Sequence, residues 1–329
     1  MNKHLVKVGV VGTGHLGQYH LKQYKSIDNL ELIGFYDINN DRRKFIKEEF
    51  SLPSFENLKK LLSQCDAVSI VTPTKTHFEV AKEALQSNCH VLIEKPITVT
   101  VEEAENLILL AKEKKKIIQV GHIERFNPAL ESLKKYNLNP TYVEFQRLAP
   151  YTVRGTDVPV VLDLMIHDID ILLSLVKDTV IDIHATGLSI LTESVDIAHA
   201  LIKFKKGCVA SITSSRISKE KVRKVKLYQK NSYTTVDLNA GLSEIYQVFS
   251  RDDMIPKALI TKPFIRNDKT KIITYDKPKV FNSDMLKLEL ENFIYSIRNN
   301  RIPIVSGEDG KEALSLAVKI QEAINKGIK

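Results

Sequence analysis

The chain has 329 residues, of which 43% are hydrophobic and 27% are charged, a composition typical of a water-soluble globular protein with room for two domains. No run of about 18 uncharged apolar residues occurs and the start lacks the apolar stretch of a signal peptide, so we expect a cytoplasmic protein without a membrane span. The formal net charge of +8 fits an anionic small molecule or a general lysine excess, and no nucleic-acid-binding motif accompanies it, so we expect no nucleic acid partner.

The first third of the chain alternates short apolar runs with stretches of helical periodicity, which is typical of a parallel sheet covered by helices. The predicted strands are residues 5–11, 30–36, 67–71, 90–93 and 117–120. The predicted helices are residues 15–25, 41–50, 54–63, 76–86 and 101–115, the last opened by a capping box of Thr100 and Glu103. The fold class is therefore α/β, with a doubly wound Rossmann domain over residues 1–121.

After Gly121 the pattern changes, and we predict an α+β domain over residues 122–329 with an open, mainly antiparallel sheet. A helix at 127–136 precedes two hairpins, 195–204 with 208–216 and 222–229 with 233–238. Helices at 284–298 and 310–326, the second started by Ser306, end the chain and could pack back on the first domain. The exposed face of this sheet has apolar residues that a second subunit would cover, so we expect a homodimer or a homotetramer through the sheet. The alternation of polar and apolar residues along the strands does not distinguish the two.

The three cysteines, Cys65, Cys89 and Cys208, show no CxxC spacing and no metal-ligand pattern with the nine histidines. Such spacing does not support a zinc site or a disulfide framework. We therefore expect inert thiols and no metal.

A glycine-rich loop follows the first predicted strand and opens a helix, the context that makes a GxGxxG string informative. Its residues are Gly12, Thr13, Gly14, His15, Leu16 and Gly17. The first glycine permits a tight turn, the second lets backbone approach a pyrophosphate, and the third allows close helix packing. An ordinary glycine-rich turn is the alternative.

Asp37 ends the second predicted strand, 20 residues after Gly17. A carboxylate there accepts hydrogen bonds from the adenosine ribose and repels a 2′-phosphate, so the sequence favours NAD over NADP as the cofactor. Arg42 and Arg43 follow closely, and an arginine there could hold a phosphate. We expect both to be exposed helix residues instead.

Two further motifs carry chemistry. Lys95 follows the predicted strand 90–93, and the carboxyl ends of such strands face the ligand crevice, so Lys95 is either a site residue or a plain surface lysine. Asp163, His167 and Asp170 have helical spacing that places them on one stripe. A histidine titrates near neutral pH and suits the removal of a hydroxyl proton, whereas the bland alternative is a surface pair that supports the helix.

The combination of motifs resembles the Gfo/Idh/MocA oxidoreductases. Four features match in order along the chain: the loop 12–17, Thr72-Pro73 with His77, Glu94-Lys95-Pro96, and the motif from Asp163 to Asp170. Residues 303–310 are also similar to the C-terminal segment of the family. The resemblance therefore spans nearly the whole chain.

The resemblance implies an N-terminal Rossmann domain, a C-terminal α/β domain, and a catalytic group of Lys95, Asp163 and His167. It implies that His167 is the general base, that Lys95 orients and polarises the reacting oxygen, and that Asp163 holds substrate or tunes its neighbours. It places Thr72, Pro73, His77, Glu94 and Lys95 along the cofactor. Residues 158–161 depart from the glycines of many relatives, so the loop over the substrate is expected to differ.

The segment 121–129 is similar to that of the family branch that oxidises C3 of UDP-N-acetylglucosamine, for later amination in lipid A assembly. We predict that such a substrate contacts Arg125, Asn127 and Arg154. The guanidinium fork of the two arginines suits a diphosphate, and the alternative is that they are structural or exposed. We expect an NAD-dependent dehydrogenase of a nucleotide sugar. The alternatives are an inositol or free-sugar dehydrogenase and a dinucleotide-binding sensor, which would have no need of a complete catalytic group.

Overall fold

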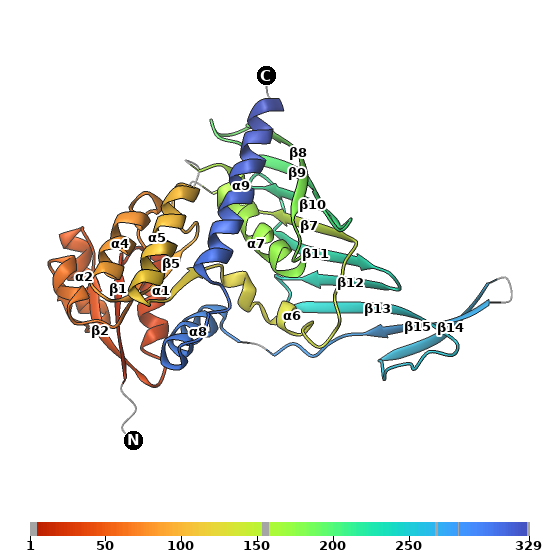
Figure 1. Cartoon of the computed structure of the whole chain (residues 1–329), viewed down its shortest axis with the longest axis horizontal. Coiled ribbons are helices and arrows are strands. Elements are labelled where there is room, and N and C mark those ends of the chain that lie inside the picture. Colours follow the sequence, from red (N-terminus) through yellow and green to blue (C-terminus); the bar gives the residue numbers. More distant parts are fainter. Residues whose placement is uncertain (1–4, 153–157, 267–268, 282, 328–329) are drawn as a thin grey trace. The chain divides into compact units, whose positions relative to one another are not determined.

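The computed structural model describes residues 5–152, 158–266, 269–281 and 283–327 (Figure 1). The chain divides into two compact units. Unit 1 comprises Met1–Phe126 and Ser283–Ser315, and unit 2 comprises Asn127–Asn282 and Leu316–Lys329. Helix α9 (Gly307–Gly327) begins in the first and ends in the second.

Unit 1 contains a six-stranded sheet in the order β3-β2-β1-β4-β5-β6, in which all neighbours are parallel. The strands are β1 (Val6–Val11), β2 (Leu30–Tyr36), β3 (Ser54–Phe55), β4 (Ala67–Ile70), β5 (His90–Glu94) and β6 (Ile118–Gly121). The helices and 3-10 turns are α1 (His15–Tyr24), α2 (Asn40–Phe50), α3 (Leu58–Leu62), η1 (Thr74–Thr76), α4 (His77–Gln86), α5 (Val101–Lys114), η2 (Ile123–Phe126) and α8 (Met285–Asn299). The predicted doubly wound parallel fold is confirmed.

The core of unit 1 joins segments far apart in the chain. Val8 and Val10 of β1 and Leu21 of α1 belong to one buried cluster with Leu290 and Phe293 of α8. The amphipathic helix predicted near residues 284–298 thus completes the core of the Rossmann sheet. The capping box of Thr100 and Glu103 is present at the start of α5.

One predicted helix of unit 1 is wrong. Residues 54–63 form the short strand β3 and the shorter helix α3. Ser54 and Phe55 pair with β2, and the side chain of Asn57 accepts the amide hydrogen of Lys59 at 2.8 Å, so the helix begins only after Asn57.

Unit 2 contains a nine-stranded sheet in the order β14-β15-β13-β12-β11-β7-β10-β9-β8. The strands are β7 (Tyr142–Leu148), β8 (Val180–Leu188), β9 (Ile197–Phe204), β10 (Val209–Ser215), β11 (Val222–Gln229), β12 (Ser232–Asp237), β13 (Leu242–Ser250), β14 (Ile260–Arg266) and β15 (Lys269–Asp276). The β7–β10 pair is parallel and the other pairs are antiparallel. The predicted open, mainly antiparallel sheet is confirmed, as are both hairpins.

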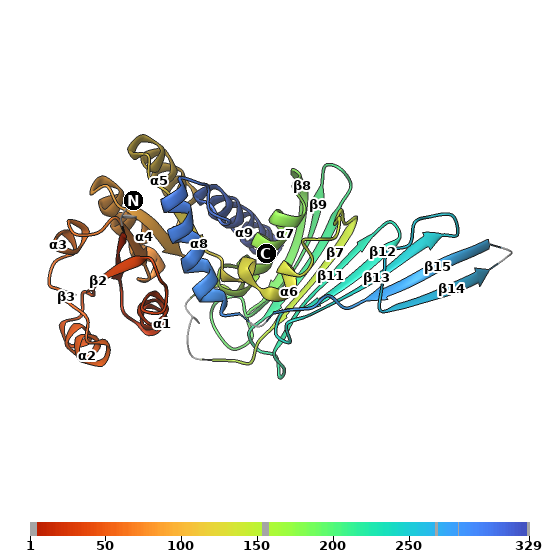
Figure 2. The ribbon, with the colours of Figure 1, turned by 90° about the horizontal axis from the view of Figure 1, so that it is seen from below.

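Helices of unit 2 lie on one side of this sheet (Figure 2). They include α6 (Pro128–Glu131) and α7 (Ile166–Leu175), which follows the π-helical turn η3 (Val161–Met165). Helix α6 is much shorter than the predicted helix at 127–136, because from Leu133 onward the chain makes bonds to residues three positions back, as in Tyr136 N–H to Leu133 C=O at 2.9 Å. No helix among the described residues is long and apolar enough to cross a membrane.

The other face of the sheet carries a tyrosine row that crosses five strands in register. It consists of Tyr142, Tyr228, Tyr233, Tyr246 and Tyr275. Successive ring centroids are 5.5, 4.9, 6.0 and 5.0 Å apart, within the range of favourable aromatic pairs. Tyr142 and Tyr246 are exposed, so this face presents aromatic surface to solvent in unit 2.

His90, the first residue of β5, links the fold of unit 1 to pH. Its Nδ1 accepts the Ile117 amide hydrogen at 3.0 Å. Burial and then the charge of Lys116 lower the pKa of His90 to about 4, although the charge of Asp66 acts in the opposite direction. Since an unfolded histidine titrates near about 6.5, the unfolded chain binds this proton at higher pH than the folded chain, and stability falls as pH drops from about 6.5 toward 4.

We expect His90→Asn to flatten the dependence of unfolding free energy on pH between about 6.5 and 4, because asparagine does not titrate and its side-chain oxygen can accept the same amide hydrogen. The contribution of His90 stays below the limit of about 1.4 kcal/mol per pH unit, since solvent reaches part of the ring. Urea unfolding at a series of pH values measures it. The same slope in both proteins would contradict this prediction.

Candidate functional site

The glycine-rich loop at the end of β1 has the shape of a pyrophosphate cradle. Gly12 has a φ of +88°, and a Cβ there would lie 2.7 Å from the Val71 carbonyl oxygen. A Cβ at Gly17 would lie 2.1 Å from the carbonyl oxygen of Gly12, whereas one at Gly14 would meet nothing within 4 Å. The outer glycines therefore let the chain pack on itself, and the middle one leaves exposed backbone at the start of α1, where a dinucleotide pyrophosphate fits.

Asp37, directly after β2, holds this loop from the side. One carboxylate oxygen accepts the Thr13 amide hydrogen at 2.7 Å and the Thr13 hydroxyl at 3.1 Å. The other accepts the amide hydrogen of Asn39 at 2.9 Å. The carboxylate thus stands at the edge of the loop, at the strand end where an adenosine ribose binds in this class of fold.

The structure corrects the expectation that Arg42 and Arg43 are exposed, because both are half-buried. Nε of Arg42 donates to the carbonyl of Thr13 at 2.8 Å, and Arg43 donates to the carbonyl of Asp37 at 2.6 Å. Both guanidinium groups therefore support the backbone of the loop and of the acidic residue.

The ends of β4 and β5 are tied by His77, which is 1% exposed. Its Nδ1 lies 2.9 Å from the carbonyl oxygen of Pro96, and its Nε2 lies 2.8 Å from that of Thr72. The hydroxyl of Thr76 donates to the hydroxyl of Thr72 at 2.8 Å, and Pro73 between them is exposed. The motif residues 72, 73 and 77 thus lie beside the turn after Lys95, whose peptide bond to Pro96 is cis.

Lys95 has an acid, Glu94, and a buried histidine, His122, among its neighbours in unit 1. Its amide hydrogen is donated to Oε2 of Glu94 at 3.3 Å, and Oε1 of Glu94 is 3.1 Å from Nε2 of His20. His122, fully buried after β6, has its pKa lowered to about 3 by burial and then by the charges of Lys95 and Arg125. His122 is therefore neutral at physiological pH, so the positive charge in this region comes from Lys95 and Arg125.

The predicted base and its acidic neighbour lie in unit 2. Asp163 is in η3 and His167 is in the first turn of α7, and both are half-buried, whereas Asp170 is 1% exposed. The spacing predicts a continuous α-helix here, but residues 161–165 form a π-helical turn. Such turns often occur at functional sites, since one extra residue per turn changes the direction of a side chain.

A buried ion pair fixes α7 to the sheet. Arg147 of β7 donates from Nε to Oδ2 of Asp168 at 3.0 Å and from Nη2 to Oδ1 at 2.7 Å. Each residue is 2% exposed. The bidentate geometry holds the residue next to His167 in one orientation on the strand.

The predicted substrate residues have different surroundings. Arg125 is half-buried in η2 and donates to the carbonyl of Ile304 at 3.1 Å. Asn127 is 2% exposed, and its side chain accepts the Ala129 amide hydrogen and donates to the carbonyl of Leu238, contacts typical of a structural cap. Arg154 lies outside the described residues.

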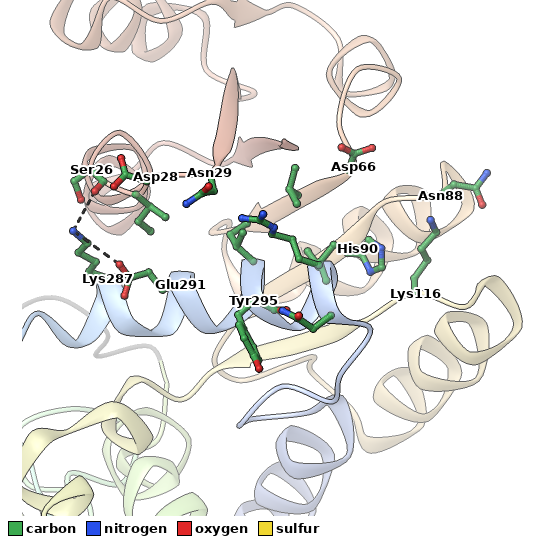
Figure 3. A pocket seen from close by; sticks show the side chains of 16 residues that line it. Ser26, Asp28, Asn29, Asp66, Asn88, His90, Lys116, Lys287, Glu291 and Tyr295 are labelled. Carbon is green, nitrogen blue, oxygen red and sulfur yellow. Dashed lines mark hydrogen bonds and ion pairs between the residues drawn. The ribbon is translucent and has the colours of Figure 1, made fainter. Parts of the chain in front are cut away.

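Unit 1 also has a cavity of about 900 Å³, which is distinct from the glycine-rich loop 12–17 (Figure 3). Val6, Asp66, His90 and Lys116 line it near the amino ends of their strands, the edge opposite to Gly12 and Lys95. Its charged side chains balance, with three acids (Asp28, Asp66, Glu291) and three strong bases (Lys116, Lys287, Arg298). With equal numbers of acids and strong bases, the lining favours neither an anionic nor a cationic ligand.

Within the described residues, no group of three or more histidine, cysteine, aspartate or glutamate side chains could hold a metal ion. The three cysteines are free. Unit 1 brings together the loop 12–17, Asp37, Thr72, His77, Glu94 and Lys95, and unit 2 contains Asp163 and His167.

Sequence reasoning missed three residues of these regions: His20, His122 and Arg147. His20 lies on the buried face of α1. A polar residue at a buried helix position could have indicated a site residue there, since the other buried positions are Gly17, Leu21 and Tyr24. Arg147 gave a similar signal, an arginine at an inward position of a strand of alternating polarity. Their partners, Glu94 and Asp168, are too distant in sequence to be paired by spacing.

Comparison with known proteins gives matches over both parts of the chain. Residues 6–122 match the model of an oxidoreductase family described as an NAD-binding Rossmann fold, and residues 127–329 match the C-terminal α/β domain of that oxidoreductase family. UDP-N-acetylglucosamine 3-dehydrogenase of Acidithiobacillus ferrooxidans is 34% identical over 320 residues, 97% of each chain. A solved structure of that enzyme has a TM-score of 0.89 at 33% identity and covers 99% of this chain and 100% of its own. Myo-inositol 2-dehydrogenase of Thermotoga maritima is 25% identical over 97% of this chain and 96% of that protein.

Proposed function

The chain belongs to the Gfo/Idh/MocA oxidoreductase family and acts on CH–OH groups, and we propose that it is an NAD-dependent dehydrogenase of a nucleotide sugar. The specific reaction that we propose is oxidation of the C3 hydroxyl of UDP-N-acetylglucosamine to the 3-keto sugar, with formation of NADH and release of one proton. The observation that carries the substrate is the likeness to a UDP-N-acetylglucosamine 3-dehydrogenase along essentially the whole of both chains. A full-length likeness to an inositol dehydrogenase makes inositol the second candidate.

In the proposed mechanism, residues 1–121 bind the cofactor and residues 122–329 bind the substrate. Bound NAD⁺ supplies a nicotinamide ring that accepts the hydride from the carbon. His167 takes the hydroxyl proton at an imidazole nitrogen. The ammonium group of Lys95 donates a hydrogen bond to the same oxygen while the carbon–oxygen bond becomes a carbonyl. Asp163 holds a neighbouring sugar hydroxyl, and Arg125 attracts the diphosphate. His122 is neutral, so it adds no second positive charge near Lys95.

We propose NAD rather than NADP because of Asp37. Its carboxylate is fixed by Thr13 and Asn39 at the position where a ribose 2′-hydroxyl donates a hydrogen bond, and it would repel a 2′-phosphate. Arg42 and Arg43 supply hydrogen bonds to backbone carbonyls, a use that competes with phosphate binding.

We expect Asp37→Ala to weaken the binding of NAD and to narrow the preference for NAD over NADP, since the variant loses both the ribose contact and the repulsion of the phosphate. Values of kcat/KM with each cofactor measure the preference. Asp41→Ala, on the exposed first turn of α2, is the matched control and should keep the ratio of the wild type. An unaltered ratio in Asp37→Ala would remove the proposed role.

We also propose that the tyrosine row is part of a subunit interface, in a dimer or tetramer paired through the sheet of unit 2. Aromatic rings in register across five strands form a flat surface that a second copy could cover. We expect Tyr233→Glu, at the centre of the row, to lower the molar mass measured by light scattering. A monomeric wild type would exclude this interface.

The substrate proposal is tested by calorimetry and by NADH absorbance with UDP-N-acetylglucosamine, free N-acetylglucosamine, glucose and myo-inositol. We expect binding and turnover of the UDP-sugar and little turnover of the free sugars, because the diphosphate supplies much of the binding energy. Efficient turnover of inositol without binding of the UDP-sugar would favour the second candidate. Binding of NAD without turnover of any alcohol would favour a sensor.

Lys95 and His167 should act on one transition state. We expect His167→Ala and Lys95→Ala each to lower kcat by roughly 10²- to 10⁴-fold with little change in cofactor affinity. The double variant should lose much less than the product of the two single losses, since residues that serve one transition state are not additive. Near wild-type kcat in either single variant would refute the assignment.

A further inference from the structure

His20 connects the helix that carries the dinucleotide loop to the end of the strand that carries Lys95. It lies on α1, three residues after Gly17, and is 1% exposed. Its Nε2 is 3.1 Å from Oε1 of Glu94, and since an ionised carboxylate only accepts hydrogen bonds, Nε2 is the donor.

The carboxylate of Glu94 is confined on three sides. Oε1 accepts from His20 on α1, and Oε2 accepts the amide hydrogen of Lys95 at 3.3 Å. A Cβ at Gly121, at the end of β6, would lie 2.9 Å from the carboxylate, so a larger residue there would displace the Glu94 side chain from its present position. Burial acts to raise the pKa of Glu94, but the hydrogen bond and charge of His20 and the charge of Lys95 outweigh burial and leave the pKa lowered. The group is therefore an anion with a fixed position.

Helix α1 joins His20, and so its contact with Glu94, to the dinucleotide loop. A helix rises by about 1.5 Å per residue, so His20 is only about 4.5 Å along the axis from Gly17, whose Cα packs against the loop. We propose that His20 is a positioning residue, which holds Glu94 and through it the backbone of Lys95 in register with the dinucleotide loop. The proposal rests on the function assigned above to Lys95.

This arrangement predicts separate effects on binding and on turnover. The His20 side chain bonds to Glu94, whereas the cradle is held at its side by the bond from Thr13 to Asp37, so loss of the His20 side-chain hydrogen bond should leave most of the cofactor affinity intact. The orientation of Lys95 relative to the bound cofactor would change, and a displacement of about 1 Å in a reacting group can cost roughly 10²-fold in rate. A loss in kcat without a matching loss in NADH affinity is therefore expected.

Three variants test this proposal in the full chain. His20→Leu introduces an apolar side chain of similar size and removes the donor, whereas His20→Gln keeps an N–H at about the reach of Nε2. Tyr24→Phe is the matched control, because it removes another buried hydrogen bond of the same helix, the one between the Tyr24 and Ser69 hydroxyl groups at 2.7 Å, and leaves the contact between His20 and Glu94 in place. Thermal unfolding of each variant shows that it is folded.

We expect His20→Leu to lower kcat by roughly 10- to 100-fold with less than a threefold change in the dissociation constant of NADH, measured by fluorescence. His20→Gln should recover most of kcat, and Tyr24→Phe should lower the unfolding temperature with kcat near that of the wild type. His20→Leu combined with Glu94→Gln should lose less than the product of the two single effects. Equal losses of kcat in His20→Leu and Tyr24→Phe, or multiplicative losses in the double variant, would overturn the proposal.

A second measurement needs no substrate. Hydrogen exchange of a peptide that covers residues 93–99 should slow when NADH binds to the wild type and to His20→Gln. In His20→Leu at saturating NADH, this protection should be largely lost, whereas protection of residues 12–17 remains. Full protection of residues 93–99 in His20→Leu would overturn the proposal even if the wild type turned over no sugar. Failure of the dehydrogenase assignment is thereby separated from failure of the role of His20.

Discussion

The contact between Gly17 and the carbonyl oxygen of Gly12 constrains the whole of the candidate cofactor site. A side chain at Gly17 would push α1 away from the end of β1, since a Cβ there would lie only 2.1 Å from the Gly12 carbonyl oxygen, and a Cβ at Gly12 would lie 2.7 Å from the carbonyl oxygen of Val71, the residue after β4. With α1 this close, Thr13 comes within reach of the Asp37 carboxylate, and His20 within reach of Glu94. The same two glycines thus determine the ribose side of the loop and the surroundings of Lys95.

In unit 2, a buried ion pair instead of close backbone packing holds the helix that carries His167. Arg147 and Asp168 are both buried, and the desolvation of such a pair offsets much of its Coulomb attraction, so it is weak evidence for added stability. What the bidentate geometry supplies is a single orientation of the first turn of α7, where His167 lies. An apolar contact could bury the same area but would tolerate sliding and rotation of the helix, because it has no directional preference.

Sequence patterns predicted well those elements whose burial is complete. The strand predicted at 67–71 is an apolar run, and its bounds differ by one residue from those of the fully buried strand β4. The strands β7, β8, β13, β14 and β15 were not predicted, and in β8, β13, β14 and β15 most of the described side chains are half-buried or exposed, so no apolar run marks them. The π-helical turn at Asp163 also escaped prediction, because over five residues its pattern does not differ from that of an α-helix. The motif residues were found, but the contacts of His20 and Arg147 depend on tertiary packing that periodicity does not encode.

The electrostatics near Lys95 follow from the same packing. Glu94 keeps its negative charge because His20 donates to it, and His122 is neutral because burial and the nearby cations disfavour a further proton. If both groups were protonated, Glu94 would lose the negative charge that attracts the ammonium group of Lys95, and His122 would become a cation that repels it. Anionic Glu94 and neutral His122 instead give half-buried Lys95 neighbours that do not repel a cation, and an ammonium cation is a strong hydrogen-bond donor to a substrate oxygen.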